Sequence, residues 1–417
     1  MTDHHPTDVC VVGAGPAGLA LSLLLLRSGV RVTLIERASG FDREFRGEIL
    51  QPGGMAVLDA LGVLSAASER GSRAHHGFQL LDGAKTLLDI DYRRLGPPYD
   101  HLLAVGQRHV LEELLSACRR HPAFTYWGGY RLAELPREGN RFAGAVAVGG
   151  AGERRTVRAR VVVGADGRYS KARRLAGIDP GRMDVFDQDV VWFKVHAPGV
   201  TVDRVRVHRR SGQAMLVYGS YPDHLQIGWT VPHGSWSAVA ARGILAVKRE
   251  LSTALPEYAD LIEEQITELS DLTLLDVFAG RAGQWVRDGL VLIGDAAHTH
   301  SPLGAQGINL ALQDAAVLHP VLLDALCEGA VDPRALDRFT TLRAPDIDAV
   351  FRFQVTQSKA MLGRPNPVAD TVRPVLARLI SRTALGGFLT RRIAHGRTPV
   401  QVRTDLFESD HHTKARA

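Results

Sequence analysis

The sequence is poor in cysteine and has no long apolar run, and each absence excludes a class of protein. Cys10, Cys118 and Cys327 are odd in number, lie far apart and include no C-x-x-C pair. They predict neither a disulfide scaffold nor a zinc site, so we expect no bound metal and a reducing, cytoplasmic compartment. The longest apolar run, Leu19 to Leu26, is shorter than a bilayer-spanning helix. The acids and histidines of residues 1–8 predict no secretory signal.

Excess charge is also small. Lys and Arg number 50 and Asp and Glu 45, which gives a net charge of +5, and residues 373–403 alone hold seven arginines and no acid. No nucleic-acid recognition motif accompanies this segment, so we expect no nucleic-acid partner. With 417 residues, 45% of them hydrophobic and 23% charged, the chain is typical of a globular protein with two domains or one large domain that carries an insertion.

The first forty residues predict a strand, a glycine-rich turn, a helix and a second strand. The β-branched run Asp8 to Val12 leads into GAGPAG (residues 13–18), an apolar helix runs to about Arg27, and the second strand is Val30 to Glu36. Glycines allow a tight turn and bring backbone N–H groups close to a pyrophosphate, whose charge the helix N-terminus favours. Glu36 is placed to bind a ribose hydroxyl, so this stretch predicts a dinucleotide site.

Two further turns indicate a large cofactor. Val161 to Arg173 reads VVVGADGRYSKAR, and Leu290 to Asp314 reads LVLIGDAAHTHSPLGAQGINLALQD. Each places an aspartate, Asp166 or Asp295, after a buried β-run, at the edge of the sheet where ligands of α/β folds bind. A helix that opens at Gly307 directs a second helix N-terminus to the same edge. One such turn can be structural, whereas three on one chain are hard to explain without a large cofactor.

These motifs resemble those of the para-hydroxybenzoate-hydroxylase class of single-component FAD-dependent aromatic monooxygenases. GAGPAG, GADGRYSKAR and GDAAHTHSPLGAQGIN occur in the family's order, and the resemblance covers residue 8 to about 345. It implies that the first motif and Glu36 hold the ADP half of FAD. The second motif would contact FAD and, transiently, NAD(P)H, while Asp295 would contact the ribityl and pyrophosphate portion. The loop from Pro302 to Asn309 would cradle the flavin ring.

The FAD contacts that the resemblance implies come from the three motifs and from two other segments, Arg46-Gly47 and Gln107-Arg108. They are Gly13, Gly15, Pro16, Ala17, Gly18, Glu36, Arg37, Arg46, Gln107, Arg108, Asp166, Gly167, Gly294, Asp295, Gly304, Gln306, Gly307, Ile308 and Asn309.

The whole pattern predicts an α/β fold. We expect an FAD-binding Rossmann-like domain of the GR2 type, interrupted by an antiparallel β-sheet substrate domain and followed by a helical C-terminal tail. The hairpin signal at Asp82-Gly83 and the alternating runs from Val190 to Val231 supply the inserted sheet. The FAD-binding domain is predicted at 1–75, 101–180 and 276–345, the substrate-domain hairpin at 76–100, the substrate sheet at 181–275 and the C-terminal helical segment at 346–417.

The chemistry that the resemblance implies is oxygen transfer. FAD is retained, NAD(P)H is a transient cosubstrate, and the reduced flavin reacts with O2 to a 4a-hydroperoxide that hydroxylates or epoxidises an electron-rich aromatic or polyketide-like substrate. Water must be excluded, or the adduct collapses to hydrogen peroxide. The sequence contains no second dinucleotide fold, which agrees with a nicotinamide that binds briefly at the surface.

The substrate is expected under the antiparallel sheet. Candidate wall residues are Trp192, Met215, Val217, Tyr218, Gln226, Trp229 and Pro302. Side chains alternate along a strand, so only about half of the strand residues can face inward, and the register stays open. The mostly apolar wall and the absence of a clear arginine clamp favour a neutral, fairly large aromatic over a small carboxylated one.

No catalytic residue can be assigned from the sequence. Tyr218 and His208 could serve as acid–base groups, although packing or surface roles are the simpler interpretation. His298 and His300 form an H-x-H pair without carboxylate or cysteine partners, so we do not expect them to bind a metal.

The arginine-rich tail allows two interpretations. The stretch from Pro374 to Ala394 is compatible with a helix that has apolar residues between its arginines. It could lie on an anionic membrane surface. The simpler interpretation is a helix that covers the FAD domain or pairs with a second subunit, with its arginines outward. Monomer and homodimer both stay open.

Other proteins use the same fold for different purposes, namely flavin-dependent halogenases, double-bond reductases and Rab-escort-like binding platforms. The stretch from Ile227 to Pro232 is similar to part of the halogenase W-x-W-x-I-P signature, but Ile227 replaces the first tryptophan, and Lys85 has no recognisable catalytic setting. A binding platform would dispense with flavin motifs that are all present. We therefore expect a monooxygenase and keep these three as alternatives.

Overall fold

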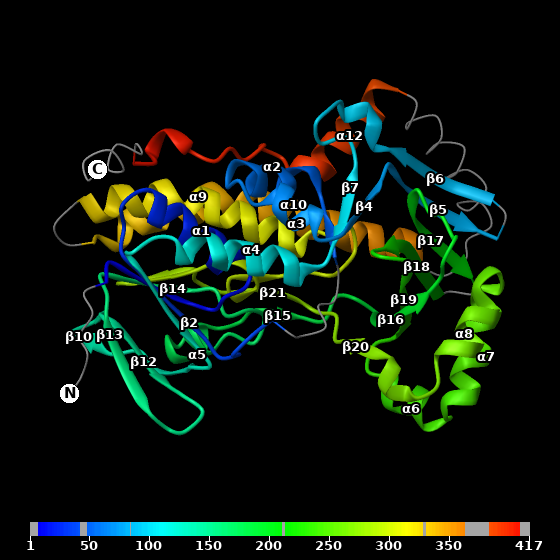
Figure 1. The fold of residues 1–417 in the computed structure, drawn as a ribbon, viewed down its shortest axis with the longest axis horizontal. Coiled ribbons are helices and arrows are strands. Elements are labelled where there is room, and N and C mark those ends of the chain that lie inside the picture. The colour runs from blue at the N-terminus through cyan, green and yellow to red at the C-terminus, as the bar shows by residue number, and fades with distance from the viewer. Residues whose placement is uncertain are drawn as a thin grey trace, which may run out of the picture.

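The structure is a computed structural model that describes residues 7–41, 48–83, 85–210, 213–327, 331–362 and 383–408. An α/β part and a second, largely antiparallel sheet lie at opposite ends of an elongated molecule (Figure 1). The long helices α9 (Gly307–Cys327) and α10 (Pro333–Leu362) pack against each other.

A six-stranded sheet forms the centre of the α/β part. In order across the sheet, its strands are β22 (Val286–Arg287), β23 (Leu290–Leu292), β14 (Val161–Gly164), β1 (Val9–Val12), β2 (Val32–Glu36) and β8 (Phe124–Gly128). Neighbours are parallel except for β22, which pairs antiparallel with β23. The central strands are apolar and buried along their whole length, as in a parallel sheet that is covered on both faces.

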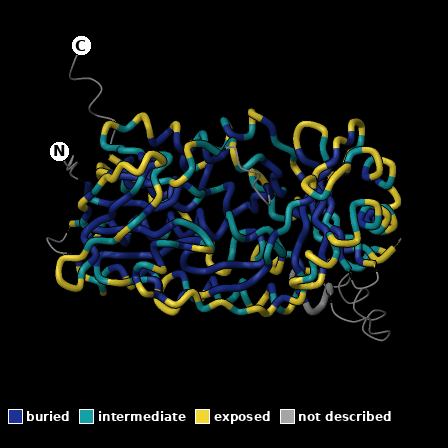
Figure 2. Tube along the Cα trace, turned by 90° about the horizontal axis from the view of Figure 1, so that it is seen from below, coloured by how far each residue is buried: buried dark blue, intermediate teal, exposed yellow. Residues whose placement is uncertain are grey.

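Three helices pack together over this sheet, namely α1 (Pro16–Arg27), α4 (Gln107–Arg119) and α9 (Figure 1). The buried side chains of α1 and of the sheet strands belong to one apolar core, seen as the dark interior of Figure 2. By length and apolarity alone α9 could cross a membrane, which differs from the expectation that no apolar run is long enough. Because 67% of its most apolar 18-residue stretch is buried in the protein, we interpret α9 as a core helix.

The second sheet has seven strands. In order, they are β20 (Thr273–Leu275), β16 (Gln188–His196), β19 (His224–Pro232), β18 (Gln213–Ser220), β17 (Arg204–Arg210), β5 (Gly77–Asp82) and β6 (Lys85–Asp91). The hairpin predicted at Asp82-Gly83 is formed by β5 and β6. One pairing differs from the predicted antiparallel sheet, because β17 and β5 run parallel. Helices α7 (Ile244–Ala254) and α8 (Ala259–Gln265) cover one face of this sheet.

Smaller elements lie outside the two large sheets. They are β3 (Ile49–Leu50), α2 (Pro52–Ala60), α3 (Leu64–Glu69), β4 (Ser72–His75), the 3-10 turn η1 (Tyr92–Leu95), β7 (Leu102–Val105), β9 (Arg131–Glu134), β12 (Gly144–Val148), β13 (Arg154–Arg158), α5 (Lys171–Leu175), β15 (Arg182–Met183), α6 (Trp236–Ala241), β21 (Ala279–Arg281), η4 (Gly294–Ala296) and β24 (His298–Thr299). Gly243 adopts a φ of +82° between α6 and α7 and separates the two helices.

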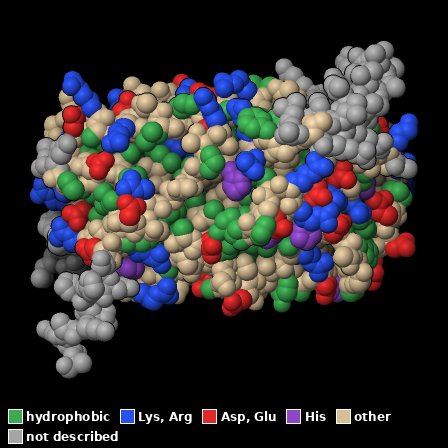
Figure 3. Space-filling model, turned by 90° about the horizontal axis from the view of Figure 1, so that it is seen from above, with side chains coloured by type: hydrophobic (Ala, Val, Ile, Leu, Met, Phe, Trp, Pro, Cys, Tyr) green, Lys and Arg blue, Asp and Glu red, His purple; other side chains and the backbone are tan. Residues whose placement is uncertain are grey.

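The described part of the C-terminal tail includes α12 (Ala384–His395), which packs against α2 and η1. The side chains of Arg391 and Arg392 are exposed. This arrangement favours the interpretation in which the tail covers the protein with its arginines outward, although residues 363–382 lie outside the described part. On the face shown in Figure 3, basic and acidic side chains are interspersed. The predicted domain boundaries stay predictions.

Candidate functional site

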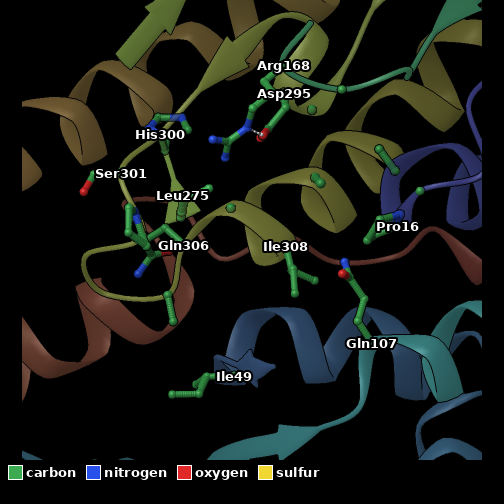
Figure 4. Close-up of a pocket in the computed structure, with 18 of the residues that line it drawn as sticks. Pro16, Ile49, Gln107, Arg168, Leu275, Asp295, His300, Ser301, Gln306 and Ile308 are labelled. Carbon is green, nitrogen blue, oxygen red and sulfur yellow. Dashed lines mark ion pairs between the residues drawn. The ribbon is translucent and has the colours of Figure 1, made fainter. Parts of the chain in front are cut away.

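A cavity of about 300 Å³, cavity 1, lies where the three sequence motifs meet (Figure 4). Its walls come from the N-termini of α1 and α9, the turns after β14 and β23, and side chains of β3, β16 and β18. The lining residues are Gly15, Pro16, Ala17, Ile49, Gln107, Ala165, Gly167, Arg168, Trp192, Leu216, Tyr218, Leu275, Ile293, Gly294, Asp295, His300, Ser301, Pro302, Ala305, Gln306, Gly307, Ile308 and Ala311.

The turn before α1 is shaped by its glycines. A Cβ at Gly18 would lie 1.9 Å from the carbonyl oxygen of Gly13, so the chain could not close there with any other residue. By contrast, a Cβ at Gly15 would meet nothing within 4 Å, which means that Gly15 borders open space. Helix α1 has no side-chain N-cap and no acid in its first turn. Pro16 has no N–H, so the first N–H of α1 is that of Ala17, a lining residue of cavity 1, and it has no acceptor within the helix.

Glu36 ends β2 and shapes the same turn. Its carboxylate accepts hydrogen bonds from the backbone N–H of Ala14 (2.8 Å) and of Ala38 (2.9 Å). Neither Glu36 nor the exposed Arg37 lines cavity 1. Arg46 and Gly47 lie outside the described residues. Gln107 lines the cavity, whereas Arg108 forms an ion pair with Glu112 at 2.7 Å.

Asp166 and Asp295, which the sequence treats alike, have different surroundings. The Asp166 carboxylate accepts hydrogen bonds from Ser170 and from the N–H groups of Lys171 and Ala172, so it caps α5 and is not among the cavity lining. Burial raises the pKa of Asp166, and these hydrogen bonds oppose the shift. Asp295 does line cavity 1, where it pairs with Arg168 at 3.6 Å (Figure 4).

Two buried cations hold these turns in place. Arg173, on α5, donates to the carbonyl oxygens of Ala296 (2.8 Å) and Arg168 (2.9 Å), and so ties the second motif to the third. Arg343, on α10, pairs with Asp314 at 2.9 Å. Asp314 also accepts from the backbone N–H of Gly294 at 2.8 Å, which fixes the start of the third turn.

His298 completes this buried network. Its Nε2 donates to Asp314 at 2.6 Å, and its Nδ1 lies 3.2 Å from His300 Nε2. Burial alone would raise the pKa of Asp314, but His298 and Arg343 outweigh it and lower the pKa to about 2. Burial, and next the nearby His298, lowers the pKa of His300 to about 3. Through Asp314, the histidine pair therefore supports the turn at Gly294. His300 also lines cavity 1.

The loop before α9 borders the cavity with backbone. Gln306, Gly307 and Ile308 line cavity 1, and a Cβ at Gly307 would meet nothing within 4 Å. The helix has no acid in its first turn. Ala305 adopts a φ of +50°, a left-handed backbone conformation that residues other than glycine seldom adopt.

Asn309 acts within the loop and is not part of the lining. Its Oδ1 accepts from the backbone N–H of Gln51 at 2.8 Å, and its Nδ2 donates to the carbonyl oxygen of Ala305 at 2.6 Å. The loop is thereby held to the start of α2.

A second cavity of about 110 Å³, cavity 2, lies next to the first. Five residues line both: Ile49, Trp192, Leu216, Pro302 and Ala305. The other lining residues of cavity 2 are Gln51, Phe78, Ile90, Tyr92, Leu102, Val190, Val205, Val207, Ala214, Gly228, Thr230, Leu303, Gly304, Phe353, Gln357 and Ile393. None of these described residues is charged.

The register of the seven-stranded sheet divides the predicted wall residues. Trp192, Tyr218 and Pro302 line one or both cavities. Met215, Val217 and Trp229 do not, because they point to the opposite face and pack in the core under α7 and α8. The prediction for these three is therefore corrected. Gln226 is paired across the strands with Tyr218 but lines neither cavity.

The two acid–base candidates also differ. Tyr218 is fully buried, burial raises its pKa well above the ordinary value, and its hydroxyl has no hydrogen-bond partner among the described residues. His208 lies away from both cavities and faces Glu257 at 3.5 Å. Burial lowers the pKa of His208. Its position removes it as an acid–base candidate.

Several lining residues were missed by sequence reasoning. Arg168 and Ser301 stand beside recognised motif residues, and Leu216 follows from alternation once Tyr218 is known to face the cavity. Phe353, Gln357 and Ile393 come from α10 and α12, and no sequence pattern indicated them.

The described residues contain one cluster with metal-ligand geometry, Asp189, His233 and Asp276, outside both cavities. Asp189 already accepts from His233 Nδ1 and from the backbone N–H groups of Gly234 and Val277, each at 2.9 Å. The cluster is thus explained by protein donors.

Comparison with known proteins identifies the cofactor. A family model described as the FAD binding domain matches residues 6–354. The chain belongs to this family of FAD-binding proteins. It is 52% identical over 406 residues to a 6-methylpretetramide 4-monooxygenase of Streptomyces rimosus, with 97% of this chain and 96% of that protein covered. It is 27% identical over 358 residues to protoasukamycin 4-monooxygenase of Streptomyces nodosus subsp. asukaensis, with 82% and 85% covered.

Solved structures share the fold. The crystal structure of p-nitrophenol 4-monooxygenase from Pseudomonas putida DLL-E4 matches with a TM-score of 0.77 at 20% identity, covering 95% of this chain and all (100%) of that one. The predictions of family, fold class, retained FAD and reaction class are confirmed: the chain is an FAD-dependent monooxygenase of the class that uses NAD(P)H. The halogenase, reductase and binding-platform alternatives are not supported.

The residues of cavity 1 fit FAD. The N-terminus of α1, which has no side-chain cap, and that of α9, which has no acid in its first turn, supply N–H donors that suit an anion such as a pyrophosphate. Gly15 and Gly307 leave the space beside them open, so that a ligand can approach the backbone closely. Apolar side chains such as Ile49, Leu275 and Trp192 line other parts of the wall, as a flat aromatic ring requires.

Proposed function

We propose that this chain hydroxylates a neutral aromatic polyketide with several fused rings, which binds in cavity 2 while FAD occupies cavity 1. The observation that carries the proposal is the shared wall of the two cavities, formed by Ile49, Trp192, Leu216, Pro302 and Ala305. The two cavities adjoin at these residues. A cofactor ring in cavity 1 and a substrate ring in cavity 2 would therefore lie close enough to react without crossing bulk solvent.

The substrate class is supported by similarity and by the lining of cavity 2. The relative with 52% identity is named for 6-methylpretetramide, so we propose this compound, or a close analogue with the same phenolic ring system, as the substrate. The apolar lining of cavity 2 suits such a ring system, and the absence of charged groups among its described residues disfavours a small carboxylate.

In this proposal, protein groups bind the cofactor and exclude water. The N–H groups at the start of α1 would hold the pyrophosphate, and those at the start of α9 would stabilise negative charge on the reduced ring. Trp192, Leu216 and Pro302 would keep water from the space between the rings. When bound, reduced FAD activates O2 and transfers one oxygen atom to an electron-rich ring. The net reaction consumes the substrate, O2, NAD(P)H and a proton, and yields the hydroxylated product, water and NAD(P)+.

Cavity 2 is smaller than the roughly 300–1,000 Å³ of most ligand pockets. A substrate with several fused rings therefore requires the wall of cavity 2 to move outward. The side of the cavity formed by Phe353 and Gln357 of α10 and Ile393 of α12 is the best candidate, because the sheet side is fixed by strand pairing. The C-terminal tail would then contribute to substrate selection.

We also retain a cytoplasmic location, the domain boundaries at residues 75, 100, 180, 275 and 345, and the FAD contacts implied by the resemblance as parts of this proposal. The three free cysteines, of which Cys10 and Cys118 are buried, are compatible with a reducing compartment.

The proposal is tested by adding 6-methylpretetramide to the purified FAD-containing protein and following NADH and NADPH oxidation together with product mass. We expect the polyketide to accelerate oxidation and to gain one oxygen atom, without any partner reductase. 4-Hydroxybenzoate serves as the control and should give little stimulation. Strong stimulation by the benzoate with none by the polyketide would refute the substrate assignment.

A further inference from the structure

The buried side chain of Trp192 carries a polar group at the junction of the two cavities. It lies on β16, is 5% exposed and lines both cavities. Its indole Nε1 finds no hydrogen-bond acceptor among the described residues. An indole N–H can only donate, so neither a tautomer nor a rotated amide changes this conclusion. A buried donor without an acceptor is destabilising, so a ligand oxygen in the adjoining cavities would stabilise it.

Gly228 positions the indole ring. In the sheet, Trp192 on β16 faces Gly228 on β19, and Gly228 in turn faces Leu216 on β18. A Cβ at Gly228 would lie 2.9 Å from Cζ3 and 3.0 Å from Cη2 of Trp192, so the six-membered ring rests directly on the glycine. The absence of a side chain at position 228 thus lets the indole lie across β19 toward Leu216, another residue of the shared wall.

We propose that Trp192 recognises the substrate by donating its indole N–H to a carbonyl or phenolic oxygen next to the ring that is hydroxylated, and that Gly228 is the positioning residue for this contact. This inference rests on the proposed placement of substrate in cavity 2. It adds a requirement that the apolar lining does not impose: the substrate must carry an oxygen acceptor at the shared wall. Polyketide phenols meet this requirement, whereas a hydrocarbon of the same shape does not.

A hydrogen bond to a phenolic oxygen has a further consequence. It stabilises negative charge on that oxygen and so favours the phenolate, which makes the ring richer in electrons and more reactive toward oxygen transfer. Among the described residues, Tyr218 (its hydroxyl) and His300 (its Nδ1) also carry a buried atom without a partner, and both residues line cavity 1 but not cavity 2. Trp192 is therefore the donor at the junction, and Tyr218 lies on the cofactor side of it.

Binding measurements on three variants of the FAD-containing protein test the proposal. Trp192→Phe keeps an aromatic ring and removes the N–H, and we expect the Kd for 6-methylpretetramide to rise about 10-fold. Gly228→Ala keeps the N–H but displaces the ring, and should raise the Kd by a similar factor. Trp229→Phe is the matched control, because Trp229 packs on the opposite face of the sheet and its Nε1 lies 3.5 Å from Gln213. Its Kd should stay within 2-fold of the wild-type value.

Single-deoxy analogues of the polyketide separate recognition from packing. The wild type should bind one of these analogues about 10-fold more weakly than the parent, and Trp192→Phe should bind that pair equally. If Trp192→Phe binds the parent as tightly as the wild type, or keeps the full discrimination, the inference is wrong. The proposed function fails in a different way, namely when the wild type itself shows no response to the polyketide.

Indole NMR gives a test that does not depend on the folding of a variant. In protein with ¹⁵N-labelled tryptophan, the Trp192 N–H signal should move downfield when 6-methylpretetramide is added to the FAD-bound enzyme, and the Trp229 signal should not. A shift of the Trp192 signal on FAD binding alone, with no further change on adding substrate, would show that the donor serves the cofactor and would overturn the proposal. Absence of any shift would overturn it as well.

Discussion

Cavity 1 and cavity 2 share a wall, but they are built from different parts of the chain. Much of cavity 1 is bounded by the turns after β1, β14 and β23 and by the N-termini of α1 and α9. Cavity 2 is bounded by side chains from β16 to β19, from the β5–β6 hairpin and from α10 and α12. Backbone turns need a fixed short sequence such as GAGPAG, whereas an apolar wall can be made by many sequences. The first site is therefore readable from the sequence and the second is not.

The largest expected effect breaks cavity 1 without unfolding the protein. In Gly15→Ala, the new methyl group meets no protein atom within 4 Å and the residue has an ordinary extended backbone, so stability should hardly change. The methyl group would occupy the space proposed for the pyrophosphate, and we expect the Kd for FAD to rise about 100-fold or more. Fluorescence titration of the apoprotein with FAD measures it.

Gly150→Ala is the matched control for that change, since Gly150 is exposed and its Cβ also meets nothing within 4 Å. It should bind FAD like the wild type. Normal FAD affinity in Gly15→Ala would mean that the pyrophosphate lies elsewhere.

A second change sharpens the comparison on the side of cavity 2. Val205 lines cavity 2, so Val205→Phe fills space that the substrate needs, and we expect the substrate Kd to rise about 10-fold while FAD binding is retained. Val217, on the neighbouring strand β18, faces the core under α7 and α8. Val217→Phe should instead cost about 1–3 kcal/mol of unfolding free energy by overpacking. Substrate titration and urea unfolding of both variants check this contrast; equal effects on both quantities would contradict it.

Acid should affect the support of cavity 1. Folding keeps His300 neutral, because its pKa is lowered to about 3, whereas the unfolded chain takes up a proton near pH 6.5. The unfolded state therefore binds more protons as the pH falls from 6.5 to about 3, and stability decreases over this window, by about 2 kcal/mol at pH 5. The contribution of Asp314, whose pKa is about 2, is present above pH 3.8 and is lost only between about pH 4 and 2.

Urea unfolding of the wild type and of His300→Gln at pH 5 and pH 7 measures this difference. The variant should lose less stability between the two values than the wild type. An equal loss of unfolding free energy between pH 7 and pH 5 in both proteins would show that His300 is not the group responsible.

The smallest effect is expected in the loop that borders both cavities. Ala305 has a φ of +50°, so Ala305→Gly relieves backbone strain but also makes the unfolded chain more flexible. These effects oppose each other, and we expect a change in unfolding free energy within about 1 kcal/mol. A thermal unfolding scan is sufficient to measure it. A loss of several kcal/mol would show that the methyl group of Ala305 has a packing role.

The sequence predicted the parallel sheet and the inserted sheet, because each depends on local patterns. Gly13, Gly15 and Gly18 could be placed from spacing alone, since the strand–turn–helix geometry leaves few choices. Asp166 and Asp295 could not be distinguished, because the two motifs look alike and only the fold decides which carboxylate turns to α5 and which to the cavity.

For the substrate wall, the limit was register. Because side chains alternate along a strand, only about half of the candidate strand residues could face inward, but the sequence did not indicate which half. Only the packing of Met215, Val217 and Trp229 under α7 and α8 resolves this choice. Phe353, Gln357 and Ile393 were out of reach for a different reason: they meet cavity 2 through tertiary packing of α10 and α12, which no local pattern records.

The central claim is that cofactor and substrate lie in two adjoining cavities that share five lining residues. A crystal structure of the protein with FAD and 6-methylpretetramide tests it most directly. We expect density for the flavin ring in cavity 1, density for the polyketide in cavity 2, and both in contact with Trp192, Leu216 and Pro302. Density for the polyketide outside cavity 2, or for the flavin ring away from these residues, would contradict the account.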